Sequence, residues 1–385
     1  MKKLAIVTTH PIQYNAPFFK MLHDRCNINI KVFYTWSQSE SEKKFDPGFG
    51  MEIKWDIPLL EGYNYSFVNN VSATPGSHHF KGINNPTLID EIQHWMPDAI
   101  LVYGWSFVSH LKVLRFFKGK IPVLFRGDST LLNENRSIKK YLRRIFLKYV
   151  YSFIDIALYA GLANKDYFLA HGIKENKLFF MPHAIDNDRF CRNENNVARG
   201  LELRKKLLIE EDALVFLFAA KLDINKNASL LINAFLNLNK NDTYLVIAGN
   251  GTLEQSLKLQ YGLKKNIRFI DFQNQNQMPN LYSMCDVFTL PSKSETWGLS
   301  VNEAMAGGKA VIISNTCGAS YDLIEHGVNG FVFKNDDIDS LKEYLQFFYD
   351  NRKFIQSMGQ RSAEMIKKYS YENDCIVLEK VFSSI

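Results

Sequence analysis

Two glutamates stand out for their spacing, because Glu295 and Glu303 lie eight positions apart in the segment SETWGLSVNEAMAGGKAVIISN, residues 294–315. Paired carboxylates usually indicate acid–base catalysis. No His, Cys or Ser nucleophile pattern surrounds this pair, however. A carboxylate also accepts two hydrogen bonds and therefore suits a vicinal diol. A second interpretation is thus that the two carboxylates hold the two ends of one extended ligand.

Two lysines upstream, Lys221 and Lys226, lie in a segment that follows the apolar run LVFLFAA. Two ammonium groups on one loop repel each other unless an anion lies between them, which favours a diphosphate clamp in which both lysines are catalytic. The alternative is a pair of solvated surface lysines. Gly249 and Gly251 follow the next apolar run, where they indicate either a plain turn or a close approach of the backbone to a ligand.

The segment after the first glutamate predicts a helix that begins between the two carboxylates. The candidates for donor binding there are Thr296, Trp297, Gly298 and Leu299. Free N–H groups at a helix N-terminus form an anion site. We therefore expect Glu295 to hold a sugar, the helix start to hold a diphosphate and Glu303 to hold a ribose. The alternative is that Glu303 interacts only with the helix dipole and that Glu295 is a loop charge.

These residues need a scaffold that brings strand ends together. Short apolar runs rich in β-branched residues alternate with helix-period segments of about 10–15 residues, which is typical of parallel sheets built from βαβ units. Ligands of such sheets bind beyond the carboxyl ends of the strands. We therefore predict an α/β fold with two doubly wound, Rossmann-like domains that face a cleft.

Polarity and patterning predict the domain boundaries. The expected parts are a first domain at residues 1–190, a linker and hinge at 191–206, a second domain at 207–365, and a C-terminal helix at 366–385 that returns to the first domain. Residues 37–77 fit the alternating pattern less well. We expect them to form a long excursion of the first domain.

The segment PSKSETWGLSVNEAMAGGKAVIISNTCGASYDLIEHGVNGFVF resembles the donor-site signature of the retaining glycosyltransferases of family 4, which have the GT-B fold. The segments AKLDINKN, IAGNGTLEQSL and PHAIDNDRF match as well, and the resemblance extends over nearly the whole chain. It implies that Glu295 contacts the transferred sugar, Glu303 the ribose, and Lys221 with Lys226 the diphosphate.

The chain departs from the family pattern at three positions. Lys221 stands where the family commonly has Arg, which keeps the charge but loses the bidentate contact with phosphate. Asn227 and Ala220 stand where the family usually has glycine. The resemblance still implies that residues 207–365 bind a nucleotide sugar and that residues 1–190 face the acceptor.

Polar residues also follow strands of the first domain, where the acceptor is expected. The family's Gly-Gly loop is replaced by THPIQYNAP, in which His10, Gln13 and Tyr14 are expected to contact the acceptor or the donor phosphate. A structural cap is the alternative for His10. Many relatives carry a His after about the fourth strand, a place that falls here on Arg126 or Asp128. An Arg cannot act as a base at neutral pH, but it can neutralise phosphate.

Residues 136–153 predict an amphipathic helix with basic residues around an apolar stripe. The stripe comprises Ile138, Tyr141, Leu142, Ile145, Phe146, Tyr149 and Phe153. One interpretation is a surface helix whose stripe packs on the sheet. The other is that its basic face docks on an anionic membrane surface, which suits a lipid-linked acceptor. No nucleic-acid motif accompanies these charges, so nucleic acid is not an expected partner.

The composition limits the remaining classes. A hydrophobic content of 46% and a charged content of 22% are those of a globular protein. Five scattered cysteines without a C-x-x-C motif favour reduced thiols over disulfides or a zinc site. We expect neither a signal peptide nor a membrane span, and therefore a cytoplasmic protein, either free or peripheral on the inner face of the membrane. No metal and no other cofactor are expected, because the lysines supply the positive charge.

The sequence thus predicts a retaining hexosyltransferase that moves a sugar from a nucleotide-diphosphate sugar to a saccharide or lipid-linked saccharide acceptor. The resemblance implies a role in bacterial surface polysaccharide biosynthesis, either of lipopolysaccharide O-antigen or of capsule. Two alternatives stay open. One is an epimerase or hydrolase of the same fold acting on the nucleotide sugar alone, and the other is a non-catalytic protein that binds sugar nucleotides.

Overall fold

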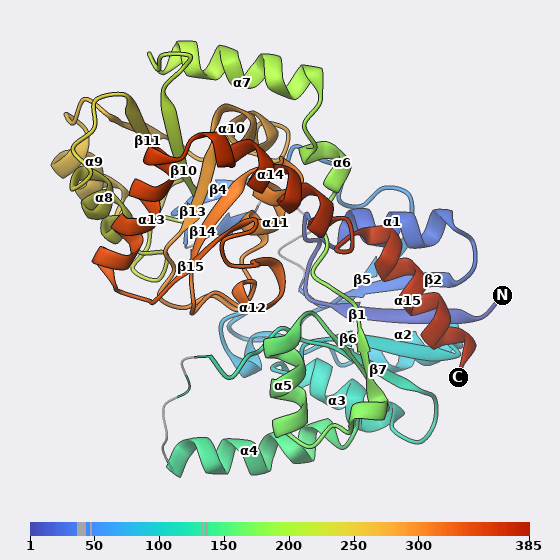
Figure 1. The fold of residues 1–385 in the computed structure, drawn as a ribbon. Helices are drawn as coiled ribbons and strands as arrows, with labels where there is room; N and C mark the ends of the chain where they lie inside the picture. Colours follow the sequence, from blue (N-terminus) through green and yellow to red (C-terminus); the bar gives the residue numbers. More distant parts are fainter. Residues whose placement is uncertain (37–43, 47, 133, 135–137) are drawn as a thin grey trace. The chain divides into compact units, whose positions relative to one another are not determined.

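The computed structural model describes residues 1–36, 44–46, 48–132, 134 and 138–385, which form two compact units (Figure 1). The first unit comprises Met1–Lys44, Ile57–His183 and Tyr371–Ile385. The second unit comprises Phe45–Asp56 and Ala184–Ser370. Each unit contains one large parallel sheet with helices in its connections, so the prediction of two doubly wound α/β units is confirmed.

The first unit is built on a seven-stranded parallel sheet in the order β5-β2-β1-β6-β7-β8-β9. Its strands are β1 (Lys3–Thr8), β2 (Asn29–Tyr34), β5 (Asn64–Phe67), β6 (Ala99–Tyr103), β7 (Val123–Arg126), β8 (Ile156–Tyr159) and β9 (Leu178–Phe180). In the centre of the sheet, Ile6 lies opposite Val32 on one side and Leu101 on the other. The chain order reverses between β1 and β6, so the ends of these two strands flank a topological switch point.

The helices of the first unit connect these strands. They are α1 (Ala16–Asp24), η2 (Phe80–Gly82), α2 (Leu88–Trp95), α3 (Val108–Phe117), α4 (Ile138–Tyr151), α5 (Leu162–Ala170), η3 (Glu175–Lys177) and α15 (Tyr371–Ser383). Helix α15 lies beside α1, where Arg25 Nε donates to the Glu379 carboxylate at 2.7 Å (Figure 1). At the chain ends, Lys2 Nζ donates to the Ile385 carbonyl at 3.0 Å.

The second unit is built on a six-stranded parallel sheet in the order β12-β11-β10-β13-β14-β15. Its strands are β10 (Leu214–Ala219), β11 (Thr243–Ala248), β12 (Ile267–Ile270), β13 (Val287–Leu290), β14 (Ala310–Ser314) and β15 (Gly330–Phe333). β10 and β11 are buried along their whole length, which explains their continuous apolar runs. The order reverses between β10 and β13, and Phe216 of β10 lies opposite Val287 of β13.

The helices of the second unit lie in the connections between these strands and at both ends of its chain segment. They are α6 (Asn187–Phe190), α7 (Glu194–Lys206), α8 (Ala228–Leu236), α9 (Glu254–Tyr261), α10 (Met278–Met284), α11 (Leu299–Ala306), α12 (Ser320–Leu323), α13 (Ile338–Asp350) and α14 (Lys353–Ile366). α8 and α13 contribute Leu231, Phe235 and Leu345 to one buried cluster with the sheet. The sheet therefore has a rigid base from which its loops project.

Most of the predicted linker at residues 191–206 is helix α7. Asn193 caps α7 by accepting a hydrogen bond from the Asn196 N–H at 2.9 Å. Arg204, which is buried, donates through Nε to the Met284 carbonyl at 2.6 Å. α7 is thus capped and anchored to α10, and the polar composition of this segment reflects the exposed face of the helix.

Residues 37–77 were predicted to form an excursion of the first domain. This prediction is corrected for residues 45–56, which belong to the second unit. Residues 37–43 and 47 lie outside the described part of the chain. β3 (Lys44–Asp46) and β4 (Met51–Ile53) form a small two-stranded sheet, and residues 45–56 belong to the second unit. Asn274 Nδ2 donates to the Lys54 carbonyl at 2.7 Å, and the Asn276 N–H donates to the Asp56 carboxylate at 3.1 Å. Such long-range bonds leave no periodic pattern in the sequence.

Candidate functional site

The loops after β10 and β13 bring a lysine and a glutamate together at the switch point of the second sheet. Lys226 Nζ donates to the Glu295 carboxylate, and the two side chains are 22% and 15% exposed. The backbone holds both loops in place. The Lys226 N–H donates to the Asp223 carboxylate at 2.9 Å, and the Lys293 N–H donates to the Asn225 carbonyl at 2.7 Å. The two predicted catalytic groups are therefore adjacent.

The electrostatics of this pair favour an added anion. Burial lowers the pKa of Lys226, and the like charge of Lys221 acts in the same direction, whereas Asp223 opposes both. A cation whose charged form is disfavoured gains from a further negative group at the site. The arrangement can therefore hold an anion at Lys226 while Glu295 accepts hydrogen bonds from hydroxyl groups. The individual roles in donor binding stay predictions.

The backbone of Glu295 is fixed from both sides by the loop after β14. Its N–H donates to the Thr316 carbonyl at 3.2 Å, and its carbonyl accepts from the Gly318 N–H at 3.0 Å. A carboxylate on a doubly anchored backbone has less conformational freedom to lose when it binds a ligand.

Helix α11 begins at Leu299, so the predicted helix start between the two glutamates is confirmed. Its N-cap is Gly298 with φ +102°, a left-handed conformation, and a Cβ there would lie 2.9 Å from Cys317 Sγ. Thr296 is exposed, whereas Trp297 is buried and donates through Nε1 to Asn302 Oδ1 at 2.8 Å. The indole therefore anchors the helix start from inside the unit.

Gly249 and Gly251 shape the loop that carries the lysines. A Cβ at Gly249, which has φ +135°, would lie 2.1 Å from the Ala220 carbonyl oxygen, and one at Gly251 would lie 2.5 Å from that of Leu222. The Leu222 N–H donates to the Asn250 carbonyl at 3.0 Å. These glycines allow the β11 loop to pack directly on the loop after β10. They act on the site through Lys221 and Leu222, and a contact with a donor stays a prediction.

Glu303 lies one turn into α11 and is 2% exposed. Its carboxylate accepts a hydrogen bond from Tyr282 Oη of α10 at 2.7 Å. In this arrangement the carboxylate fixes α11 against α10. Its predicted contact with a ribose requires the ligand to share or replace the Tyr282 bond, and sequence spacing alone gave no sign of that tyrosine.

Phe49 is a neighbour of the site that the sequence did not predict. Lys221 Nζ lies 4.6 Å from the centroid of the Phe49 ring, within the range of a cation–π contact. The Phe49 and Phe272 rings meet edge to face with centroids 4.9 Å apart. Residues 45–56 thus supply an aromatic side chain beside one of the two predicted clamp lysines, from far away in the sequence.

The acceptor-side candidates lie at strand ends of the first unit. His10 Nδ1 shares a hydrogen bond with Thr9 Oγ1 at 2.9 Å, and the His10 ring meets Trp36 edge to face at 5.3 Å. Gln13 and Tyr14 are half-buried in the turn before α1. The first three candidates therefore share the loop between β1 and α1, and their contact with an acceptor stays a prediction.

Arg126 and Asp128 differ in their surroundings. Asp128 is exposed, whereas Arg126 is 7% exposed and donates to the carbonyls of Met181 at 2.6 Å and Pro182 at 2.7 Å. In this arrangement Arg126 ties β7 to the segment after β9. Its guanidinium therefore has a structural role that the sequence did not indicate, because the carbonyl partners are distant in the chain.

Two titratable groups near Arg126 were not predicted either. Burial raises the pKa of Asp374 on α15 to about 8, against the opposing effect of Arg126. Burial and Arg126 together lower the pKa of His183 to about 3, so its imidazole is neutral. A His followed by an apolar pair in PHAID was the only available signal for His183, and no local pattern marked Asp374.

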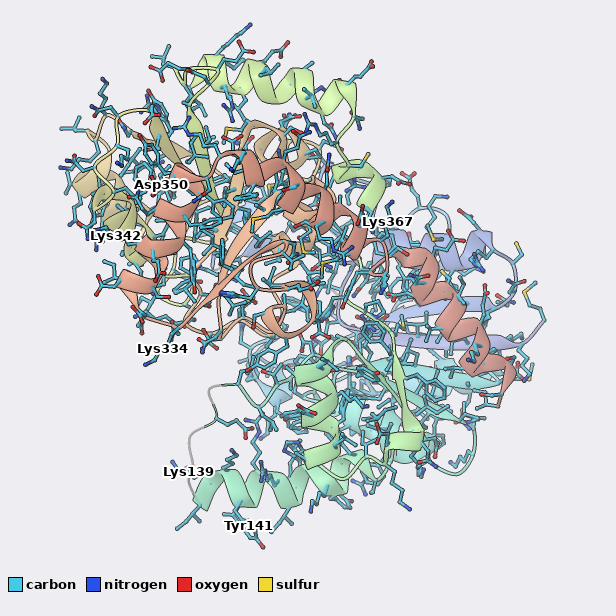
Figure 2. The ribbon with its side chains drawn as sticks, viewed as in Figure 1. Lys139, Tyr141, Lys334, Lys342, Asp350 and Lys367 are labelled. Carbon is cyan, nitrogen blue, oxygen red and sulfur yellow. The ribbon has the colours of Figure 1, made fainter. Side chains whose placement is uncertain are left out.

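Helix α4 exposes most of its predicted apolar stripe, which corrects the interpretation that the stripe packs on the sheet. Leu147, Val150 and Tyr151 are the buried residues of α4. The exposed residues are Ile138, Tyr141, Leu142, Ile145, Phe146 and Tyr149, from 43% to 82% exposed. Lys139 and Tyr141 point away from the ribbon in Figure 2. Arg136 and its neighbours at 135–137 lie outside the described residues.

The described part of the chain contains neither a candidate metal site nor a candidate membrane-spanning helix. No group of three or more His, Cys, Asp or Glu side chains there could hold a metal ion. Among the described helices, none combines the length and the apolar character that crossing a bilayer requires.

Residues 201–365 match the family model described as glycosyl transferases group 1. This match coincides with the sheet and helices of the second unit and contains the Lys226–Glu295 pair.

Named relatives match over a similar extent of the chain. An uncharacterized glycosyltransferase of Methanocaldococcus jannaschii is 28% identical over 180 residues, which are 45% of this chain and 45% of the relative. The UDP-Gal:alpha-D-GlcNAc-diphosphoundecaprenol alpha-1,3-galactosyltransferase of Escherichia coli is 31% identical over 185 residues, 46% of each chain. The chain thus spans about half the length of these curated relatives.

Structural similarity extends over the whole chain. The crystal structure of Anabaena HepE in complex with UDP and glucose superposes with a TM-score of 0.75, at 17% identity, and covers 100% of both chains. At this identity the likeness concerns the fold. It confirms the predicted class of two parallel-sheet α/β units of the GT-B type.

The helix start at Gly298 gives a first test of the site's construction. Gly298→Ala should lower the free energy of unfolding by about 2–5 kcal/mol, because the left-handed backbone costs an L residue about 1–2 kcal/mol and the contact with Cys317 adds an overpacking cost of about 1–3 kcal/mol. Gly327→Ala is the matched control, since Gly327 has φ +80° and open space around its Cβ position. Equal losses in the two variants, measured by denaturant unfolding, would contradict the packing described here.

Proposed function

We propose that the protein is a retaining glycosyltransferase that moves a sugar from a nucleotide-diphosphate sugar to a saccharide or lipid-linked saccharide acceptor. The proposed setting is the synthesis of a bacterial surface polysaccharide. The observation that carries the proposal is the Lys226–Glu295 ion pair at the switch point between β10 and β13. It lies within the residues that match a family of glycosyl transferases.

In the proposed donor complex, Lys226 and Glu295 no longer pair with each other. The diphosphate replaces the Glu295 carboxylate as the partner of Lys226, with Lys221 and the start of α11 at Gly298 providing further positive potential. Glu295 is then available to the hydroxyls of the transferred sugar. We also propose that these lysines take the place of a metal ion at the diphosphate.

The reaction breaks the bond between the anomeric carbon and the diphosphate oxygen and forms a bond to an acceptor hydroxyl oxygen. The proton of that hydroxyl passes to the departing diphosphate, so no enzyme carboxylate acts as the base. Lys226 stabilises the negative charge that develops on the leaving group. Retention is proposed from the resemblance of the segment around Glu295 and Glu303 to the family 4 signature.

The acceptor is proposed from the relatives and from helix α4. The name of the Escherichia coli relative gives it an acceptor sugar on diphosphoundecaprenol, a lipid carrier. α4 carries six exposed apolar side chains together with the exposed cations Lys139, Arg143 and Lys148. Apolar insertion combined with positive charge favours an anionic lipid surface. We therefore propose that α4 docks the first unit on such a surface.

Replacement of Lys226 gives the test of the catalytic proposal. A screen of UDP-, GDP- and ADP-sugars by thermal shift first identifies the donor, since a ligand at about 100 times its Kd adds about 2.7 kcal/mol to the free energy of unfolding. Lys226→Ala should then lower kcat about 10²–10³-fold, because it removes one preorganised stabiliser of the leaving group.

Lys264→Ala is the control, because it removes an exposed lysine from the same unit. A near-normal rate in Lys226→Ala would refute the clamp. Donor consumption at full rate without an acceptor would favour the hydrolase or epimerase alternative, and donor binding without turnover over a broad set of acceptors would favour a binding protein. The anomeric configuration of the product, read by NMR, tests retention.

Membrane docking is tested by removing charge from α4. The double variant Lys139→Ser and Arg143→Ser should bind anionic vesicles about 30-fold more weakly than the unaltered protein, because each cation contributes about 1 kcal/mol near the surface. Vesicle sedimentation measures this change. The control replaces Lys264 and Lys265, two exposed cations of the second unit, by Ser. Equal weakening in both double variants, or binding to zwitterionic vesicles as strong as to anionic ones, would exclude docking through α4.

A further inference from the structure

A cavity of about 300 Å³ lies at the amino ends of β10, β13 and β14 in the second unit. Its lining includes Ala213, Asp286 and Lys309, each of which directly precedes one of these strands. The Lys226–Glu295 pair follows β10 and β13 and therefore lies at the opposite edge of the sheet. Strands of four to six residues separate the two edges by about 15 Å.

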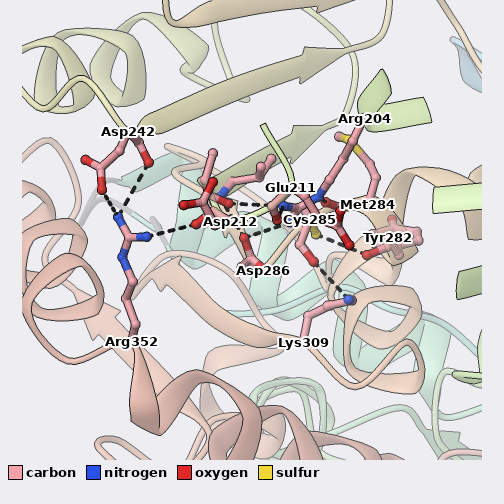
Figure 3. Close-up of polar contacts among 12 residues, drawn as sticks. Arg204, Glu211, Asp212, Asp242, Tyr282, Met284, Cys285, Asp286, Lys309 and Arg352 are labelled. Atoms are coloured by element: carbon pink, nitrogen blue, oxygen red, sulfur yellow. Dashed lines mark hydrogen bonds and ion pairs between the residues drawn. The ribbon is translucent and has the colours of Figure 1, made fainter. Parts of the chain in front are cut away.

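Four cationic side chains line this cavity: Arg192, Arg204, Lys309 and Arg352. Two of them form ion pairs with carboxylates of the protein, as Figure 3 shows. Arg204 Nη2 donates to Asp286 Oδ2 at 2.9 Å, and Arg352 donates to the carboxylate of Asp242. These guanidinium groups give the wall a fixed geometry.

Lys309 differs from Arg204 and Arg352 because, within the described part of the chain, it forms no ion pair with a carboxylate. Its Nζ donates to the Cys285 carbonyl at 2.9 Å (Figure 3), and no Asp or Glu of the described residues lies within ion-pair distance of it. Burial lowers the pKa of Lys309, Arg192 and Arg204 add to this effect, and Asp286 opposes it. Burial also raises the pKa of the Cys285 thiol to about 12, so that group stays neutral.

None of the acidic side chains that line the cavity forms an ion pair with Lys309. Asp286 is engaged by Arg204 and by the Val215 N–H at 2.8 Å. Glu211 and Asp212 are exposed, and the arginines take their backbone carbonyls, each at 3.0 Å. A half-buried ammonium group beside two further cations, in a cavity at the lower end of the size range for small-molecule sites, is the environment of an anion site.

We propose that this cavity is a second ligand site, which binds a small soluble molecule carrying a phosphate group, with Lys309 and Arg192 as its free charges. Arg204 borders the site, but its guanidinium group is already held by the Met284 carbonyl and the Asp286 carboxylate. The ligand occupies the edge of the sheet away from the loops of the proposed donor site. It therefore does not compete with a donor, and the proposal holds whether or not the proposed function does.

The cavity also has a direct link to helix α11. The Lys309 N–H donates to the Ala304 carbonyl at 3.0 Å, and Gly308, with φ +69°, joins the lysine to the end of that helix. The other end of α11 begins at Gly298 in the candidate site. The cavity is thus joined through the backbone of Gly308 and Lys309 to the helix that begins in the candidate site.

The test is thermal unfolding of the full chain in saturating inorganic phosphate against chloride at the same ionic strength. The melting temperature should rise by about 2–4 °C in phosphate, in line with linkage for one bound ligand. The rise should persist in Lys226→Met and disappear in Lys309→Met. Lys309→Met should fold normally in chloride, because it replaces a half-buried ammonium group that has no carboxylate partner by an apolar chain of similar length. Arg192→Ser, at an exposed position, should reduce the rise in the same way.

Several outcomes would overturn the proposal. These are the absence of a phosphate-specific rise in the unaltered protein, a rise that survives in both Lys309→Met and Arg192→Ser, and a rise that is lost in Lys226→Met. A hexose monophosphate serves as a second probe. A larger rise with the sugar phosphate than with inorganic phosphate assigns the site to phosphorylated sugars, and an equal rise assigns it to the phosphate group alone.

Discussion

The ion pair between Lys226 and Glu295 is the interaction around which the candidate site is built. Each group satisfies the other inside a partly buried site. The cost of holding Lys226 charged there is reflected in the downward direction of its pKa. A ligand that offers an anion to the lysine and hydroxyls to the carboxylate supplies both halves of this interaction at once. The pair thus holds in place two polar groups of the kinds that such a ligand requires.

The topology of the second sheet is what makes that pair possible. The chain order reverses between β10 and β13, so the loops that follow these strands diverge around one point. The bond from the Lys293 N–H to the Asn225 carbonyl joins the two loops, and the packing of Gly249 on the Ala220 carbonyl fixes the loop after β10 from the other side. Gly249 and the loop backbone thus determine where Lys226 lies, even if they do not contact a ligand.

The sequence predicted the two α/β units and the helix start after Glu295, because these follow from local periodicity and from strand-end positions. It placed Lys226 and Glu295 after strands of the same sheet but did not predict that they pair with each other. It did not predict contacts that join distant segments. The bond from Tyr282 to Glu303 and the packing of Phe49 beside Lys221 depend on how helices and loops meet in three dimensions. The helical state of residues 194–206 was hidden by a polar composition. The exposure of the α4 stripe could not be predicted either. Periodicity shows that one face of a helix is apolar, but it does not show which part of the protein, if any, covers that face.

The affinity of Glu295→Gln for UDP, determined by titration calorimetry beside the unaltered protein, shows directly whether a diphosphate displaces Glu295 from Lys226. If Glu295 occupies Lys226 only until a diphosphate replaces it, the amide variant should bind UDP more tightly, because the lysine no longer has to leave a carboxylate. The same variant should bind the intact nucleotide sugar with a smaller gain or a loss, since the sugar hydroxyls lose a charged acceptor. Weaker binding of UDP by Glu295→Gln would contradict the account.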